Sequence, residues 1–197
     1  MNKIKDSKIF IIFSILMGFV VIISNYLVQF PFTYFGFEEL LTYGAFSYPI
    51  AFLITDLTNR KFGIKKAKQV VYFGFLVGIL LSIFFSLGSF NLITLRITFA
   101  SATAFLIAQL IDVNIFNNLR KKEWFIPPLV SSVVGSIIDT IIFFSIAFYG
   151  TEINWISLAF GDLCVKIFVA LFMLIPFRIL LNYIKDANSN KKVLESY

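Results

Sequence analysis

The stretch Gly161-Asp-Leu-Cys-Val-Lys-Ile-Phe-Val-Ala-Leu-Phe172 is apolar, yet it carries an acid and a base four residues apart. An ionised side chain near the centre of a bilayer costs about 2.5–3.5 kcal/mol on insertion scales. Asp162 and Lys166 are therefore expected to face a protein interior and to meet partners there. The stretch predicts a membrane-spanning helix with one polar face.

The composition of the whole chain is that of an integral membrane protein. Its 197 residues are 59% hydrophobic and 14% charged, and their mean hydropathy is +0.89. A soluble domain carries about 25% charged residues. The chain has no histidine and a single cysteine, Cys164, which excludes an internal disulfide framework and most zinc sites. We therefore expect neither a metal nor another cofactor.

Six hydrophobic segments are interpreted as spans, because a helix that crosses a bilayer takes about 20 residues. The second of them is short and contains Pro49. The sequence thus predicts an all-α, polytopic membrane protein with six transmembrane helices. The predicted spans are residues 9–30, 43–58, 69–90, 97–117, 125–149 and 155–181.

The distribution of basic residues sets the orientation of these spans. Fifteen of the seventeen lysines and arginines lie before the first span or in segments 59–68, 118–124 and 178–197, all on one side of the predicted membrane. The opposite loops contain only Arg96, and Lys166 lies within a span. Because cytoplasmic loops are enriched in basic residues, both termini are expected to be cytoplasmic. The net charge of +6 then reflects topology, and no nucleic-acid partner is expected.

The predicted domain organisation follows from these boundaries. A cytoplasmic N-terminus (1–8) precedes a single six-helix transmembrane domain (9–182) in the lipid bilayer, and a cytoplasmic polar tail (183–197) follows it. The loops around residues 31–42, 88–96 and 150–154 are expected to face outward.

Polar side chains at membrane depth are the candidates for a binding site. They are Asn25, Gln109, Asp112, Asp139, Asp162 and Lys166. Because charged groups facing lipid are strongly unfavourable, these side chains should point inward. Asp56 and Arg60 lie near the cytoplasmic mouth, where a gate or an interfacial ion pair is expected instead of ligand contact.

The role of Lys166 has two alternatives. An ion pair with Asp139 or Asp162 would act as a structural pin between helices. Buried ion pairs stabilise poorly compared with apolar packing, however, so this many polar groups favours a wet or ligand-holding cavity. Asp139 and Gln109, which both lie on faces flanked by small residues, are expected to line the same cavity.

Several ordered stretches of the chain resemble the bacterial queuosine precursor transporter family, whose members are also called vitamin-uptake-like transporters. The similarity runs from about residue 24 to residue 180. Ser136 departs from the family pattern, in which an amide side chain is expected, so no ligand contact is assigned to it. The stretches that carry the resemblance are SNYLVQFP (24–31), YGAFSYP (43–49), TDLTNRKFG (55–63), AQLIDVNIFNNLR (108–120), DTIIFFSIAF (139–148) and DLCVKIF (162–168).

The resemblance implies uptake of 7-deazaguanine bases, the cyano and aminomethyl precursors of a modified tRNA nucleoside, across the bacterial inner membrane. It also implies a compact fold similar to the substrate-binding components of energy-coupling-factor transporters. A carboxylate can accept both adjacent N–H groups of such a deazapurine base, which suits Asp139 and Asp162. Lys166 could donate to the ring carbonyl, while Asn25 and Gln109 could complete the polar edge.

Other functions stay open as alternatives. The chain lacks the P-loop pattern G-x-x-x-x-G-K-[ST], so it either works alone, as the resemblance favours, or binds a purine-like or vitamin ligand for separate ATPase modules. An intramembrane enzyme is less favoured, because Phe160-Gly161-Asp162 holds only part of an aspartyl protease pattern and position 159 is alanine. A purely structural subunit is equally disfavoured, and a homo-oligomer is left open.

Overall fold

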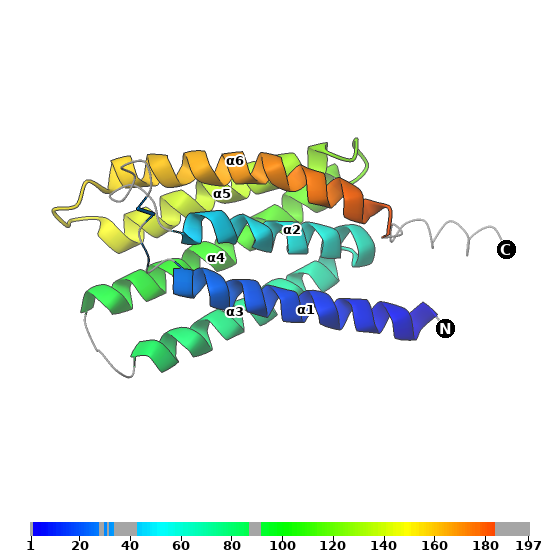
Figure 1. Cartoon of the computed structure of the whole chain (residues 1–197), viewed down its shortest axis with the longest axis horizontal. Coiled ribbons are helices and arrows are strands. Elements are labelled where there is room, and N and C mark those ends of the chain that lie inside the picture. Colours follow the sequence, from blue (N-terminus) through cyan, green and yellow to red (C-terminus); the bar gives the residue numbers. More distant parts are fainter. Residues whose placement is uncertain (1, 28–29, 31, 34–42, 87–91, 184–197) are drawn as a thin grey trace.

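The computed structural model describes residues 2–27, 30, 32–33, 43–86 and 92–183. In this part of the chain every regular element is an α-helix, which confirms the all-α part of the predicted fold class (Figure 1). The helices are α1 (Asn2–Leu27), α2 (Gly44–Phe62), α3 (Ile64–Ser86), α4 (Leu92–Leu119), α5 (Ile126–Phe148) and α6 (Trp155–Leu181).

The observed helices overlap all six predicted spans but differ from them at the ends. Helix α1 begins at Asn2, so most of the segment predicted as an N-terminal extension continues the first helix. Helix α4 begins at Leu92, before the predicted start near residue 97. The predicted tail, apart from Tyr183, and most of the predicted outer loop 31–42 lie outside the described residues.

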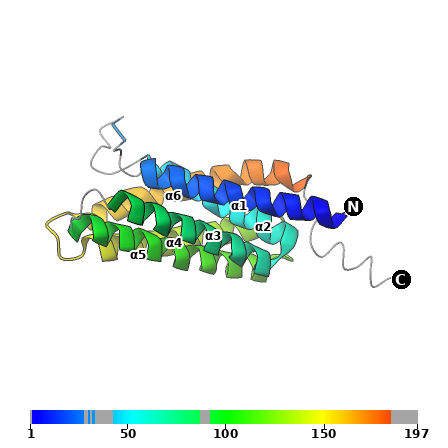
Figure 2. The same ribbon diagram turned by 90° about the horizontal axis from the view of Figure 1, so that it is seen from below.

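Helix α2 occupies the middle of the bundle and contacts each of the other five helices (Figure 1 and Figure 2). Thirteen of its 19 residues are buried. A helix enclosed by protein needs no apolar surface toward lipid, which explains why α2 can carry Asp56, Arg60 and Lys61. Accordingly, α2 is not among the four helices of the described chain, α1, α4, α5 and α6, that are long and apolar enough to cross a membrane by themselves.

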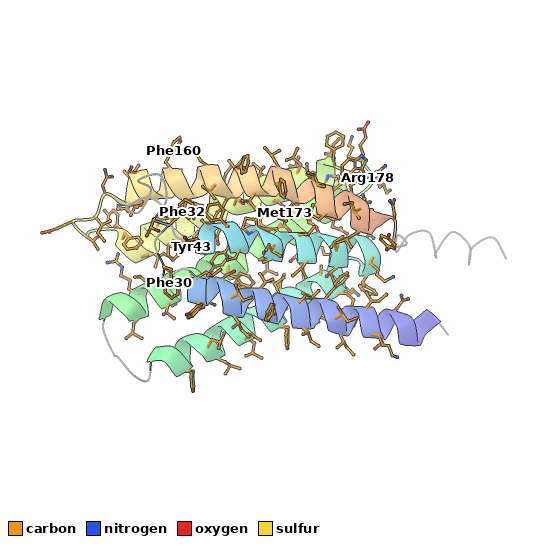
Figure 3. All side chains as sticks on the ribbon, in the orientation of Figure 1. Phe30, Phe32, Tyr43, Phe160, Met173 and Arg178 are labelled. Carbon is orange, nitrogen blue, oxygen red and sulfur yellow. The ribbon has the colours of Figure 1, made fainter. Side chains whose placement is uncertain are left out.

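Large apolar side chains cover the outside of the bundle, while polar ones lie inside it. Phe160 projects away from α6 with 71% of its surface exposed (Figure 3). Other exposed apolar residues follow the outer faces of several helices, among them Ile15, Phe19, Leu76, Leu80, Phe99, Ile141, Phe168 and Phe172. Soluble proteins rarely expose such extensive apolar surface, so this arrangement is that of a membrane protein.

The connections between helices gather the basic segments at one end of the bundle. The start of α1, the junction between α2 and α3, the α4–α5 connection and the end of α6 all lie at this end (Figure 1). The α5–α6 connection lies at the opposite end, where Phe32 packs against Tyr43 and Phe46 with 5.3 Å between ring centroids in each pair (Figure 3). We call these the basic end and the aromatic end.

A glycine sets the close approach of α5 to α2 and α4. A Cβ atom at Gly135 would lie 2.7 Å from Cε1 of Phe52 on α2 and 3.5 Å from Cβ of Asp112 on α4. The first distance is shorter than a carbon–carbon contact allows, so a larger residue would force the Phe52 ring to move. This packing brings the polar faces of the three helices together.

Candidate functional site

Lys166 of α6 is the centre of a buried group of polar side chains. Its Nζ atom lies 2.8 Å from Oδ2 of Asp139 on α5 and 2.5 Å from Oδ2 of Asp162, one turn earlier on α6. The ammonium also donates to Oγ1 of Thr140 at 3.3 Å, and that hydroxyl donates to Oδ2 of Asp162 at 2.9 Å. We call Lys166, Asp139, Asp162 and Thr140 the lysine cluster.

The charges of the lysine cluster do not balance. One ammonium faces two carboxylates, while Lys166 is only 4% exposed. A buried carboxylate requires hydrogen-bond donors or a cation, because the charged form loses its hydration. The cluster can therefore accept further N–H donors or a second positive charge from a bound molecule.

Tyr48 of α2 connects the lysine cluster with a small pocket toward the aromatic end. Its ring centroid lies 6.0 Å from Nζ of Lys166, and its hydroxyl shares a 3.1 Å hydrogen bond with Oγ of Ser101 on α4. Tyr48, Ser101 and Asn25 contribute the polar groups that line this pocket between α1, α2, α3 and α4. Asn25 donates to the carbonyl oxygen of Val21 at 3.0 Å. An aromatic ring beside a cation thus borders a mainly apolar pocket that contains three polar side chains.

A second buried group lies nearer the basic end. Asp56 of α2 accepts hydrogen bonds from Ser131 and Ser132 of α5 at 3.3 and 3.5 Å. Asp112 of α4 faces both Asp56 and Ser131, and within the described residues neither of its carboxyl oxygens makes a hydrogen bond of normal geometry. We call Asp56 and Asp112 the acid pair. In the described chain no three acidic or cysteine side chains come together as a metal site would require.

A protein-family model described as "Putative vitamin uptake transporter" matches residues 42–181. The "Queuosine precursor transporter" of Escherichia coli (strain K12) is 34% identical in an alignment that covers 88% of this chain and 86% of that protein. The chain belongs to the queuosine precursor transporter family. A "Probable queuosine precursor transporter" of Haemophilus influenzae is 35% identical over 196 residues, covering 84% of this chain and 83% of that protein. No solved structure matches the chain significantly.

In this member of the queuosine precursor transporter family, the six predicted substrate residues fall into separate groups. Asp139, Asp162 and Lys166 form the lysine cluster, and Asn25 lines the pocket that Tyr48 connects to it. Gln109 instead accepts a 2.7 Å hydrogen bond from Oγ1 of Thr55, and Asp112 belongs to the acid pair.

Asp139 and Gln109 share no hydrogen-bond partner among the described residues, and their place in one cavity stays a prediction. Along α5, Asp139 of the lysine cluster lies seven residues beyond Ser132, which bonds to Asp56 of the acid pair. At 1.5 Å per residue, about 10 Å of helix separates the two groups.

The two residues predicted at the cytoplasmic mouth have different neighbours in the structure. Asp56 bonds to the serines of α5, whereas Arg60 donates to the carbonyl oxygen of Arg120 at 3.0 Å. The guanidinium of Arg120 donates in return to the carbonyl oxygen of Arg60. Arg60 also lies over the ring of Phe116, at 5.7 Å from its centroid. These contacts join α2 to α4 at the basic end, and a gating role for them stays a prediction.

Reasoning from the sequence assigned no site role to three residues that make hydrogen bonds here, Tyr48, Thr140 and Ser131. Thr140 directly follows Asp139, and Tyr48 precedes the proline of the short second span, so each stood beside a recognised feature. No sequence feature marks Ser131 over the other serines of α5. Its role depends on the rotation of α5 against α2, which is a tertiary property.

Proposed function

We propose that this protein takes up queuosine precursors, the cyano and aminomethyl 7-deazaguanine bases, across the bacterial inner membrane. The protein is a transporter and not an enzyme, as its curated relatives are. The observation that carries the proposal is the lysine cluster, in which one cation and two carboxylates meet inside an apolar bundle. The family resemblance supplies the substrate class, and the cluster supplies matching chemistry.

The chemistry of a guanine-like edge fits the lysine cluster. Adjacent N–H groups of the base would donate to Asp139 or Asp162, and Lys166 would donate to the ring carbonyl. In the empty site Lys166 binds both acids but neutralises only one carboxylate, and the ligand exchanges one set of charge-assisted hydrogen bonds for another. The aminomethyl cation of one precursor would compensate the second carboxylate. Tyr48 would offer an aromatic face for the base, and Asn25 a further polar contact.

We further propose that all six helices span the membrane as one multi-pass domain with both termini in the cytoplasm. The gathering of basic segments at one end supports this orientation, because positively charged loops are retained on the cytoplasmic side. The substrate would then enter from the aromatic end. The resemblance is to a family of transporters that work alone, which favours a carrier that needs no ATPase partner.

Cysteine labelling of intact cells tests this orientation. In a Cys164→Ser background, a cysteine replacing exposed Glu152 should react with a membrane-impermeant maleimide added outside. A cysteine replacing exposed Lys66 should react only after the cells are permeabilised. The two positions lie in the α5–α6 connection and the first turn of α3, at opposite ends of the bundle. The reverse labelling pattern would invert the proposed topology.

The proposed function is tested in a bacterial strain that neither makes nor imports queuosine precursors. Expression of this chain should restore uptake of labelled cyano and aminomethyl precursors and the appearance of the modified nucleoside in tRNA. Empty vector provides the control for passive entry. The purified chain in liposomes should also bind and exchange the precursor without added ATPase modules. Failure to exchange either precursor in liposomes, despite folded protein, would refute the stand-alone carrier.

A further inference from the structure

The acid pair has no role in the substrate chemistry proposed above. Asp56 is 1% exposed and Asp112 is 0% exposed. In the described part of the chain no ion pair reaches either of them, and the buried ammonium of Lys166 is already bound to Asp139 and Asp162. An ionised carboxyl group that is buried without a cation beside it is costly in a bundle of this kind.

The groups that face the acid pair come from three helices. Asp56 on α2 faces Ser131 and Ser132 of α5 and Asp112 of α4. Asp112 faces Ser131 and Asp56, and its Cβ atom lies beside Gly135 of α5. The nearest basic side chain along α2, Arg60, lies one turn further on and bonds to the Arg120 carbonyl. The only charged group that directly faces each acid within the described chain is thus the other acid.

Two carboxyl groups in contact, away from water, do not both stay ionised. A single proton resolves the arrangement, because the protonated carboxyl group donates to the ionised one. With the proton on Asp112, its hydroxyl group donates to Asp56, and an oxygen that makes no hydrogen bond in the described chain gains a partner. The hydroxyls of Ser131 and Ser132 hold the carboxylate of Asp56 in place meanwhile.

We propose that the acid pair binds a proton that is co-transported with the precursor, so that the inward proton gradient drives uptake. The inference rests on the proposed function. The proton would come from external water, reside on the acid pair while the precursor occupies the lysine cluster, and leave to cytoplasmic water. No covalent bond of the precursor changes.

Helix α5 provides the physical connection between the two sites. It carries Asp139 of the lysine cluster and, about 10 Å away, the serines that hold Asp56. A shift of α5 on precursor binding would therefore change the donors available to the acid pair. Binding of the proton and of the precursor would then depend on each other, as linkage requires.

Liposomes containing the purified chain test the proposal with the neutral cyano precursor, whose own charge adds nothing to the balance. An imposed gradient, acidic outside, should raise the initial uptake rate about tenfold and allow accumulation, and a protonophore should remove both effects. A pH-sensitive dye inside the liposomes should report acidification that accompanies uptake. This second measurement needs no variant and so does not depend on how well a variant folds.

The decisive variant is Asp112→Asn, because an amide donates to Asp56 but cannot release a proton. It should retain exchange of labelled for unlabelled precursor, which moves no net proton, and lose the response to the gradient. Asp6→Asn makes the same chemical change at a half-exposed residue that pairs with Lys61 at 3.3 Å, and it should behave as wild type.

Several results would overturn the proposal. One is uptake that depends on sodium and ignores the pH gradient. Another is an Asp112→Asn variant that still responds to the gradient. A third is loss of exchange by the folded variant, which would place Asp112 in the substrate site. If the folded wild type exchanges no precursor under any gradient, the proposed function fails and the coupling proposal fails with it.

Discussion

Replacing Lys166 with methionine should abolish precursor uptake and lower the amount of folded protein in the membrane. The change removes the ammonium that lies 2.8 Å from Asp139 and 2.5 Å from Asp162, and it leaves a buried and a partly buried carboxylate without a cation. Removing one partner of a buried ion pair costs about 3–5 kcal/mol, because the remaining charge stays desolvated. Uptake by cells and the amount of protein extracted in folded form measure the two effects.

A neutral triple variant separates the structural role of Lys166 from ligand binding. Combining Lys166→Met with Asp139→Asn and Asp162→Asn removes all three charges while keeping hydrogen-bonding groups at the two acid positions. This variant should recover much of the lost abundance but none of the uptake. If it regains uptake as well, Lys166 is only a structural counter-ion. Lys61→Met provides the matched control, since Lys61 pairs with Asp6 outside the cluster and should be dispensable.

Asp139→Asn should reduce uptake about 10- to 100-fold while leaving the protein in the membrane. Hydrogen bonds to charged groups are worth about 1.5–3 kcal/mol, which corresponds to this range. Folding should survive, because Lys166 keeps its ion pair with Asp162 and the cluster becomes neutral. The aminomethyl precursor should lose more than the cyano precursor, since its cation loses a compensating carboxylate.

Initial uptake rates of the two labelled precursors, normalised to membrane abundance, measure the effect of Asp139→Asn. Asp6→Asn controls for the same substitution outside the site. Unchanged rates in the Asp139 variant would remove this residue from the substrate site. An equal loss for both precursors would contradict the charge argument while leaving the hydrogen-bonding role intact.

The lysine cluster illustrates how far local reasoning from the sequence extends. Asp162 and Lys166 are four residues apart in one helix, so their contact follows from helix geometry as soon as the helix is recognised. Asp139 was named as the alternative partner, and the structure brings both acids to the same ammonium. Choosing between one partner and two required the relative position of α5 and α6, which no local pattern contains.

The central place of α2 was harder to predict. Its short, polar sequence predicts one span among six, and the structure adds that the other five helices surround this span. The sequence of a helix reports how much apolar surface it offers, but not which neighbours cover it. For the same reason the sequence groups Asp56 with Arg60 but does not predict the hydrogen bonds that Asp56 accepts from Ser131 and Ser132.

The sequence by itself determined the helical class, the positions of the helices and the asymmetry of basic segments, because each of these depends on the composition of contiguous residues. Only the tertiary structure decided that Asp139 joins Lys166, that Gln109 bonds to Thr55, and that Asp112 meets Asp56. Those contacts join residues 27 to 56 positions apart and depend on how each helix is rotated about its axis. The rotation of each helix depends on how its side chains fit those of its neighbours. At Gly135, for example, the missing side chain leaves room for the ring of Phe52.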